Sequence, residues 1–174
     1  MGEPKIRYYV AASIDGFVAP QDGSVAWLEP FMAVAMRDYD AFIAGIGGVV
    51  LGRATYDQLP ELGGWYGDLP GAVVTSRPLG HRYPGVEPVH DAARAIRSLR
   101  GRMTSGDIWL VGGGRTAAGF LATGLIDAIE LTTIPVVLGA GRPLFGGSDH
   151  QARFDLESRS ETGEGTTFAI YRKR

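Results

Sequence analysis

The 174-residue sequence has no cysteine, only three histidines, and no apolar run of the roughly 18 residues that a membrane-spanning helix needs. Without cysteine there can be no disulfides, no thiolate catalysis and no cysteine-ligated metal. Three scattered histidines do not favour a histidine-rich site, so we expect no metal. The start of the chain lacks the apolar segment of a signal peptide, which predicts a cytoplasmic protein.

The sequence also lacks an excess of basic residues. Lysine and arginine number 17, aspartate and glutamate 19, and the formal net charge is −2. Proteins that bind nucleic acids usually carry a basic surplus. We therefore expect neither a nucleic acid nor a membrane as partner. The expected partner is a small-molecule substrate.

Glycine, in contrast, is abundant: 26 residues, about twice the usual share of roughly 7%. The apolar fraction of 45% and the charged fraction of 21% are those of an ordinary folded protein. The length fits a single domain over residues 1–174. The glycines therefore need an explanation other than disorder, and their positions along the chain supply one.

Apolar strand-like segments alternate with helical ones, which predicts crossover units and a mostly parallel sheet. A terminal antiparallel pair, 153–157 and 166–172, makes the sheet mixed, and helices are expected on both faces. The helices are predicted over 31–46, after Gly52, from the N-cap Asp91 to Arg100, and over 115–123. The strands are predicted at 6–14, 49–51, 72–75, 86–89, 108–111 and 126–134.

The predicted helix 31–46 carries one acidic residue on its apolar side. At 100° per residue, Asp38 lies within about 40° of Phe42, whereas Asp40 points to the opposite side. A carboxylate on an apolar stripe is costly without a partner, so Asp38 is a candidate functional residue. The alternative is that Asp38 lies at the edge of the helix and is solvated.

Three predicted strands end in similar chemistry. Residues 108–116, IWLVGGGRT, run from a strand through three glycines into a helix, whose first amides favour an anion. Residues 49–55, VVLGRAT, and 73–78, VVTSRP, end in an arginine beside hydroxyl residues. Ligands of open α/β sheets bind beyond the carboxyl ends of the strands, where all three segments would meet. Taken singly, each could be an ordinary turn with a solvated arginine.

The ordered series ASIDG, VVLGRATY, VVTSRP and WLVGGGRTAAGFL resembles the dihydrofolate reductase superfamily. It is most similar to the bacterial branch related to the reductase (C-terminal) domain of the bifunctional riboflavin biosynthesis deaminase-reductase, over roughly residues 6–172. IPVVLGAGRPLFG, residues 134–146, also fits that branch better than housekeeping dihydrofolate reductase. The resemblance implies a three-layer dihydrofolate reductase-like α/β fold and an NADPH (NADP) cofactor.

The resemblance implies that strand ends hold the cofactor. In the family, a Gly-Arg-x-Thr motif and a glycine segment lie at the phosphates and the nicotinamide, and a strand-end segment receives the 2′-phosphate of NADP. Small residues of the first strand lie beside the nicotinamide ring. The matching positions are Ala11, Ala12, Gly52, Arg53, Thr55, Thr75, Ser76, Arg77, Val111, Gly112, Gly113, Gly114, Arg115 and Thr116.

The resemblance also implies a substrate site, with Asp38 as the catalytic acid. Asp38 and Phe42 have the family spacing of an acid and a phenylalanine four residues later. The other implied substrate contacts are Ala12, Asp22, Trp27 and Thr132. The stretch between Trp27 and Asp38 is longer than in housekeeping dihydrofolate reductases. We therefore expect a ribosylated pyrimidine, and not folate, as the substrate. A phosphate on such a substrate would need a basic partner, for which Arg142 is the candidate.

The expected activity is NADPH-dependent reduction of a pterin- or pyrimidine-type heterocycle by hydride transfer. One alternative is an NADP-binding protein of the same fold with little or no catalysis. Another is an unrelated α/β enzyme that binds a different nucleotide. The resemblance further implies a homodimer. The candidate interface residues, each of which fits the core of the domain equally well, are Trp65, Tyr66, Phe145 and Phe154.

Overall fold

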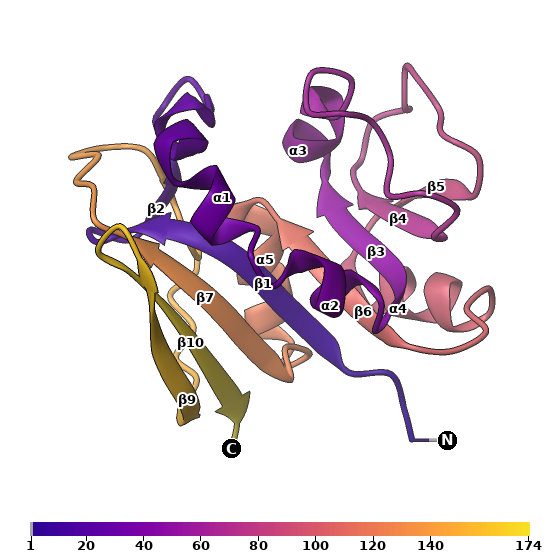
Figure 1. Ribbon diagram of the computed structural model, residues 1–174. Coiled ribbons are helices and arrows are strands. Elements are labelled where there is room, and N and C mark those ends of the chain that lie inside the picture. The colour runs from indigo at the N-terminus through magenta and orange to yellow at the C-terminus, as the bar shows by residue number, and fades with distance from the viewer. Residues whose placement is uncertain (1) are drawn as a thin grey trace.

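The computed structural model describes residues 2–174, which form a sheet between two layers of helices (Figure 1). Eight strands form the main sheet in the order β5-β4-β3-β6-β1-β7-β10-β9, and β2 pairs with β8 in a small second sheet. The strands are β1 (Ile6–Ser13), β2 (Phe17–Ala19), β3 (Ile46–Gly52), β4 (Gly71–Val74), β5 (Val86–Val89), β6 (Asp107–Gly112), β7 (Ala128–Ile134), β8 (Arg142–Pro143), β9 (Phe154–Gly163) and β10 (Thr166–Lys173).

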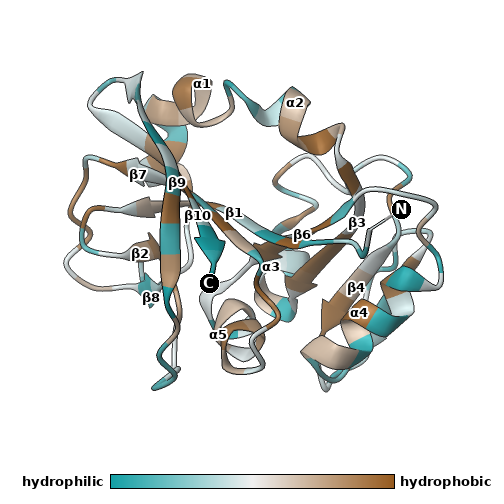
Figure 2. Ribbon diagram, turned by 90° about the horizontal axis from the view of Figure 1, so that it is seen from below, coloured by the Kyte–Doolittle hydropathy of each residue, from teal (hydrophilic) through white to brown (hydrophobic). Residues whose placement is uncertain are grey.

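Helices cover both faces of the sheet, as Figure 2 shows from below. Two short helices, α1 and α2, lie on one face, and α4 and α5 lie on the other. No described helix is long and apolar enough to cross a membrane. The helical segments are the 3-10 helix η1 (Ala26–Phe31), α1 (Met32–Ala35), α2 (Tyr39–Ile43), α3 (Arg53–Gln58), α4 (Ala92–Arg100) and α5 (Gly114–Ala122).

The predicted fold class is confirmed. Strands β5, β4, β3, β6, β1 and β7 pair in parallel, and β10 and β9 add the antiparallel end of the sheet. Asp91 caps α4 as predicted, because its Oδ1 accepts a hydrogen bond from Arg94 N at 2.7 Å. The β2–β8 pair was not predicted, since β8 has only two residues and no alternating pattern.

The predicted helix 31–46 is wrong. The segment contains α1 and α2, with a turn at 36–38 between them, and Ile46 already belongs to β3. Successive backbone bonds from Arg37 N to Val34 O (3.2 Å) and from Tyr39 N to Met36 O (3.1 Å) show tight turns in place of a continuous helix. Counting 100° per residue assumes an unbroken helix, so the break changes the direction of every side chain on one side of it.

Two apolar clusters form the core, one on each face of the sheet. Tyr8, Leu110 and Phe120 belong to the cluster under α4 and α5. Phe42, Trp109 and Tyr56 belong to the cluster on the other face. The four aromatic residues considered for a dimer interface are partly buried and pack against these clusters, so each contributes to the core of its own domain: Trp65, Tyr66, Phe145 and Phe154.

Candidate functional site

A cavity of about 690 Å³ lies at the carboxyl ends of β3, β4 and β6. The parallel register aligns these ends, because Gly52 pairs with Val74 and Leu51 with Gly112. Eight of the predicted cofactor residues line the cavity: Gly52, Arg53, Thr55, Arg77, Gly113, Gly114, Arg115 and Thr116. The structure thus brings together the ends of three segments that are up to 60 residues apart in the chain.

The two glycine motifs are locked to each other. Thr55 Oγ1 accepts a hydrogen bond from Gly113 N at 3.0 Å, which joins the start of α3 to the start of α5. Thr116 packs against Gly52 so closely that a Cβ at position 52 would overlap its hydroxyl. The peptide bond between Gly112 and Gly113 is cis. The absence of side chains at these glycines therefore allows the two helix starts to approach.

One wall of the cavity comes from a segment whose glycines were expected to border this edge of the sheet but which was given no cofactor residue. It consists of Gly141, Arg142, Pro143, Gly146 and Gly147. Gly146 N donates to Gly114 O at 3.2 Å, and a Cβ at Gly114 would collide with Pro143 O. The glycines of segment 139–147 were the only sequence signal for this contact. Arg142, expected near a substrate phosphate, lines this cavity at the strand ends.

The arginines of the cavity differ in what they contact. Arg53 Nε donates to Asp57 Oδ1 at 2.7 Å, and its NH1 donates to Pro78 O at 2.7 Å. Within residues 2–174, the side chains of Arg77 and Arg115 make no hydrogen bond or ion pair, and both residues are exposed. Arg53 therefore braces α3 against the loop after β4, whereas Arg77 and Arg115 are available to an anionic ligand.

The other six predicted cofactor residues do not line the cavity: Ala11, Ala12, Thr75, Ser76, Val111 and Gly112. Thr75 is buried, and its Oγ1 accepts from Arg77 N at 3.0 Å, so it shapes the turn that presents Arg77. Ser76 is exposed in that turn. Val111 packs against the aromatic cluster around Trp109. Gly112 lies beside the Tyr8 ring and has a φ of 116°, a conformation that favours glycine.

The two alanines of β1 point to opposite faces of the sheet, because side chains alternate along a strand. Ala11 is on the side of Tyr9, which stacks on Phe42 of α2 with ring centroids 4.2 Å apart. Its partner across the β1–β7 ladder is Thr132, which is buried. Ala12 is buried on the other face. A ligand ring on one face of the sheet can therefore contact only one of the two alanine side chains.

The loop before η1 contacts Arg142 of the cavity wall. Gln58 Nε2 donates to Gly23 O at 2.9 Å, and Arg142 NH2 donates to Asp22 O at 3.4 Å. This loop is thus held between α3 and β8. Trp27 follows in η1 and is partly buried; its indole Nε1 is buried and has no hydrogen-bond partner among the described residues.

Asp38 is not on a buried stripe. Its side chain is 57% exposed, lies at the N-cap of α2 and approaches Arg37 NH2 at 3.6 Å. Phe42 is buried as expected. The hydroxyl of Tyr9 donates to Ala35 O at 3.2 Å, and burial, with Asp38 as the next cause, raises the pKa of Tyr9 to about 12. Asp38 therefore lies at the exposed start of α2, and its charge acts on the Tyr9 hydroxyl.

The family comparison matches residues 72–168 to the RibD C-terminal domain, a segment that includes β4, β6, the glycine run and most of the cavity wall. The chain belongs to the RibD C-terminal domain family. The resemblance to the reductase domain of riboflavin biosynthesis is therefore confirmed at the level of family and fold.

Relatives of this RibD C-terminal domain protein match along nearly its whole length. The uncharacterized protein YwjB of Bacillus subtilis is 32% identical over 164 residues, 93% of this chain and 94% of YwjB. A candidate riboflavin biosynthesis protein from Shewanella sp. PV-4 superposes with a TM-score of 0.82 at 26% identity, covering 98% and 99% of the two chains. RibD of Acinetobacter baumannii shares the fold, with a TM-score of 0.74 at 19% identity, and this chain spans 59% of its length.

Proposed function

We propose that this protein is an NADPH-dependent reductase that transfers a hydride to a pterin- or pyrimidine-type heterocycle. The observation that carries the proposal is the 690 Å³ cavity at the strand ends, into which two unpartnered arginines and the N-terminus of α5 are directed. Membership of the RibD C-terminal domain family supports the same activity. We further propose that residues 1–174 act as one reductase domain.

The cavity fits a dinucleotide chemically. Arginine side chains suit phosphate groups, and the first amides of the nine-residue helix α5 favour an anion. The volume lies within the roughly 300–1,000 Å³ typical of ligand pockets. In the proposed complex, Arg77 holds the 2′-phosphate, and Gly113, Gly114 and Arg115 hold the pyrophosphate. Bound NADPH supplies the hydride, and Ala11 with Thr132 lines the side of β1 where the acceptor ring is placed.

The proposed role of Asp38 is to hold a proton for the acceptor, directly or through water. Its position at the start of α2, where its charge acts on the Tyr9 hydroxyl, is compatible with this role. Its exposure of 57% and its contact with Arg37 instead favour a solvated residue. The exposure of Asp38 therefore favours a second candidate function, that of an NADP-binding protein with little or no catalysis.

Replacing Arg77 with alanine is expected to weaken NADPH binding by about 10- to 100-fold, because one charge-assisted contact to a phosphate is lost. NADH, which lacks the 2′-phosphate, should bind the variant and the wild type equally. Calorimetric titration with both nucleotides checks this. Arg82→Ala is the matched control, since Arg82 is an exposed arginine of the same loop that does not line the cavity. Equal losses for both nucleotides would contradict the assignment.

The change Asp38→Asn is expected to lower turnover by about 10²-fold while leaving NADPH affinity intact, because a positioned proton donor typically contributes 10²–10⁴-fold. NADPH oxidation should be followed across pterins and pyrimidines, with Asp40→Asn as the control one residue beyond Tyr39. Tight NADPH binding without turnover of any compound by the wild type would favour the binding protein. A substrate turned over equally by both variants would remove Asp38 from the mechanism.

A further inference from the structure

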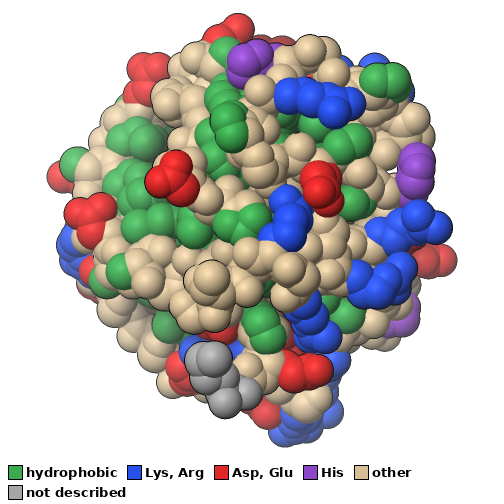
Figure 3. All heavy atoms as spheres, turned by 90° about the vertical axis from the view of Figure 1, so that its right-hand side faces the viewer, with side chains coloured by type: hydrophobic (Ala, Val, Ile, Leu, Met, Phe, Trp, Pro, Cys, Tyr) green, Lys and Arg blue, Asp and Glu red, His purple; other side chains and the backbone are tan. Residues whose placement is uncertain are grey.

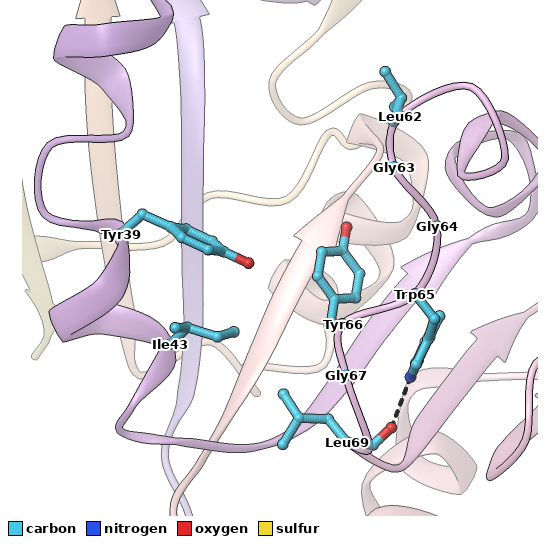
Figure 4. Close-up of a pocket in the computed structure, with 9 residues that line it drawn as sticks. All are labelled: Tyr39, Ile43, Leu62, Gly63, Gly64, Trp65, Tyr66, Gly67 and Leu69. Atoms are coloured by element: carbon cyan, nitrogen blue, oxygen red, sulfur yellow. Dashed lines mark hydrogen bonds between the residues drawn. The ribbon is translucent and has the colours of Figure 1, made fainter.

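A second cavity, of about 470 Å³, lies between α2 and the loop after α3. It shares no lining residue with the cavity at the strand ends. Figure 4 shows Tyr39 and Ile43 of α2 on one side and the loop on the other, with the Tyr39 ring pointing toward Tyr66 of the loop. The side chains that line it are Tyr39, Ile43, Leu62, Trp65, Tyr66 and Leu69, and glycines form the rest of the wall.

The position of the tyrosine rings is set by the core. Tyr66 packs edge-on against Trp109 with ring centroids 4.8 Å apart, and Tyr39 does the same at 5.9 Å. The loop is held by Trp65, whose Nε1 donates to Leu69 O at 2.8 Å and whose ring stacks on Tyr83. Both walls of the cavity are therefore ordered by aromatic packing, and a ligand would not have to organise them.

Two hydroxyl groups enter this apolar space without partners. Within residues 2–174, neither the Tyr39 nor the Tyr66 hydroxyl makes a hydrogen bond to another residue. Burial raises the pKa of Tyr66, and to a smaller extent that of Tyr39, so both remain neutral hydrogen-bond donors at physiological pH. Apolar walls with a few convergent polar groups are typical of sites for small flat molecules.

The residues that line the cavity carry no charge that could pair with an anion. No lysine, arginine or histidine lines it. Four acidic residues are neighbours of lining positions in the chain, Asp38, Asp40, Glu61 and Asp68, and Asp38 is paired with Arg37. All four are exposed. Figure 3 shows one face of the molecule, on which hydrophobic side chains gather mainly on one side and Lys and Arg side chains mainly on the other.

We propose that the cavity between α2 and the 62–69 loop binds a planar aromatic group that carries hydrogen-bonding substituents and no negative charge. We assign this group to the molecule that the protein reduces, and that assignment alone rests on the proposed function. The occupant is then not a phosphorylated sugar. A substrate whose phosphate had to enter this cavity would meet apolar and aromatic walls and no lining cation, and such an environment is costly for a charged group.

Three probes of nearly equal shape test the charge requirement: benzamide, benzamidine and benzoate. Binding is followed by amide resonances, with Gly63, Gly64 and Gly67 reporting on this cavity and Gly113 and Gly146 on the strand-end cavity. Benzamide and benzamidine should shift the first group, and benzoate should bind at least about tenfold more weakly. Benzoate binding as tightly as benzamide, or shifts confined to Gly113 and Gly146, would overturn the proposal.

Single hydroxyl deletions test the recognition groups without emptying the core. Tyr39→Phe and Tyr66→Phe keep the rings that pack on Trp109, and each should weaken benzamide binding by about fivefold. Tyr171→Phe on β10, which lines neither cavity, should change nothing. Unchanged affinity in both cavity variants would refute recognition by the hydroxyls. The titrations contain no NADPH, so their outcome is separate from any failure to detect a reductase.

Discussion

Gly114→Ala is expected to lower the free energy of unfolding by about 2 kcal/mol and to weaken NADPH binding at least about tenfold. A Cβ at this position would collide with the carbonyl oxygen of Pro143, which is backbone and cannot rotate away. The segment carrying Pro143 and Gly146 would have to move off the start of α5, with loss of the hydrogen bond from Gly146 N to Gly114 O. Denaturant titration and nucleotide calorimetry measure the two effects.

Gly119→Ala is the matched control for this change. Gly119 lies in the same helix, is exposed, and a Cβ there would meet nothing within 4 Å. Alanine is a better helix former than glycine, so this variant should gain about 0.5–1 kcal/mol and bind the nucleotide normally. If Gly114→Ala were as stable as Gly119→Ala, the close packing of segment 142–147 on α5 would not exist in solution.

The contrast between these two glycines shows what the sequence could reveal. The run of three glycines after a buried strand predicted a strand-to-helix junction with an exposed set of amides, and α5 does begin at Gly114. This succeeded because the signal is local: an apolar strand, glycines and a following helix are neighbours in the chain. The same holds for Gly52 and α3, and for the Asp91 cap of α4.

Contacts between distant segments left no such local signal. Gly114 must be glycine because Pro143 lies against it, yet nothing in positions 108–116 specifies that neighbour. The wall at 141–147 was therefore not assigned to the cofactor. The break at 36–38 was missed for a related reason, since Ala35 and Phe42 on its two sides keep the helical spacing although the chain turns between them. The second cavity forms between α2 and the 62–69 loop. The periodicity of the sequence does not show that these two segments approach each other.

Arg7→Met is expected to destabilise the fold by about 3 kcal/mol, because it leaves Glu130 as a buried carboxylate without its partner. Arg7 donates through Nε and NH2 to the two oxygens of Glu130, the latter at 2.8 Å, and Glu130 is only 3% exposed. Arg172→Met is the control, since it removes an exposed pair with Glu157 and should cost less than about 1 kcal/mol. Chemical denaturation of both variants provides the comparison.

Arg7 also supports α2, which gives this change a functional consequence. Its guanidinium lies over the Phe42 ring, 4.6 Å from the centroid, and Phe42 stacks on Tyr9 close to Asp38. Adding Glu130→Leu to Arg7→Met removes the orphaned carboxylate and should restore most of the stability, but not the contact with Phe42. The double variant should therefore fold and bind NADPH normally, yet turn over substrate more slowly. Turnover equal to that of the wild type would show that the position of α2 does not depend on Arg7.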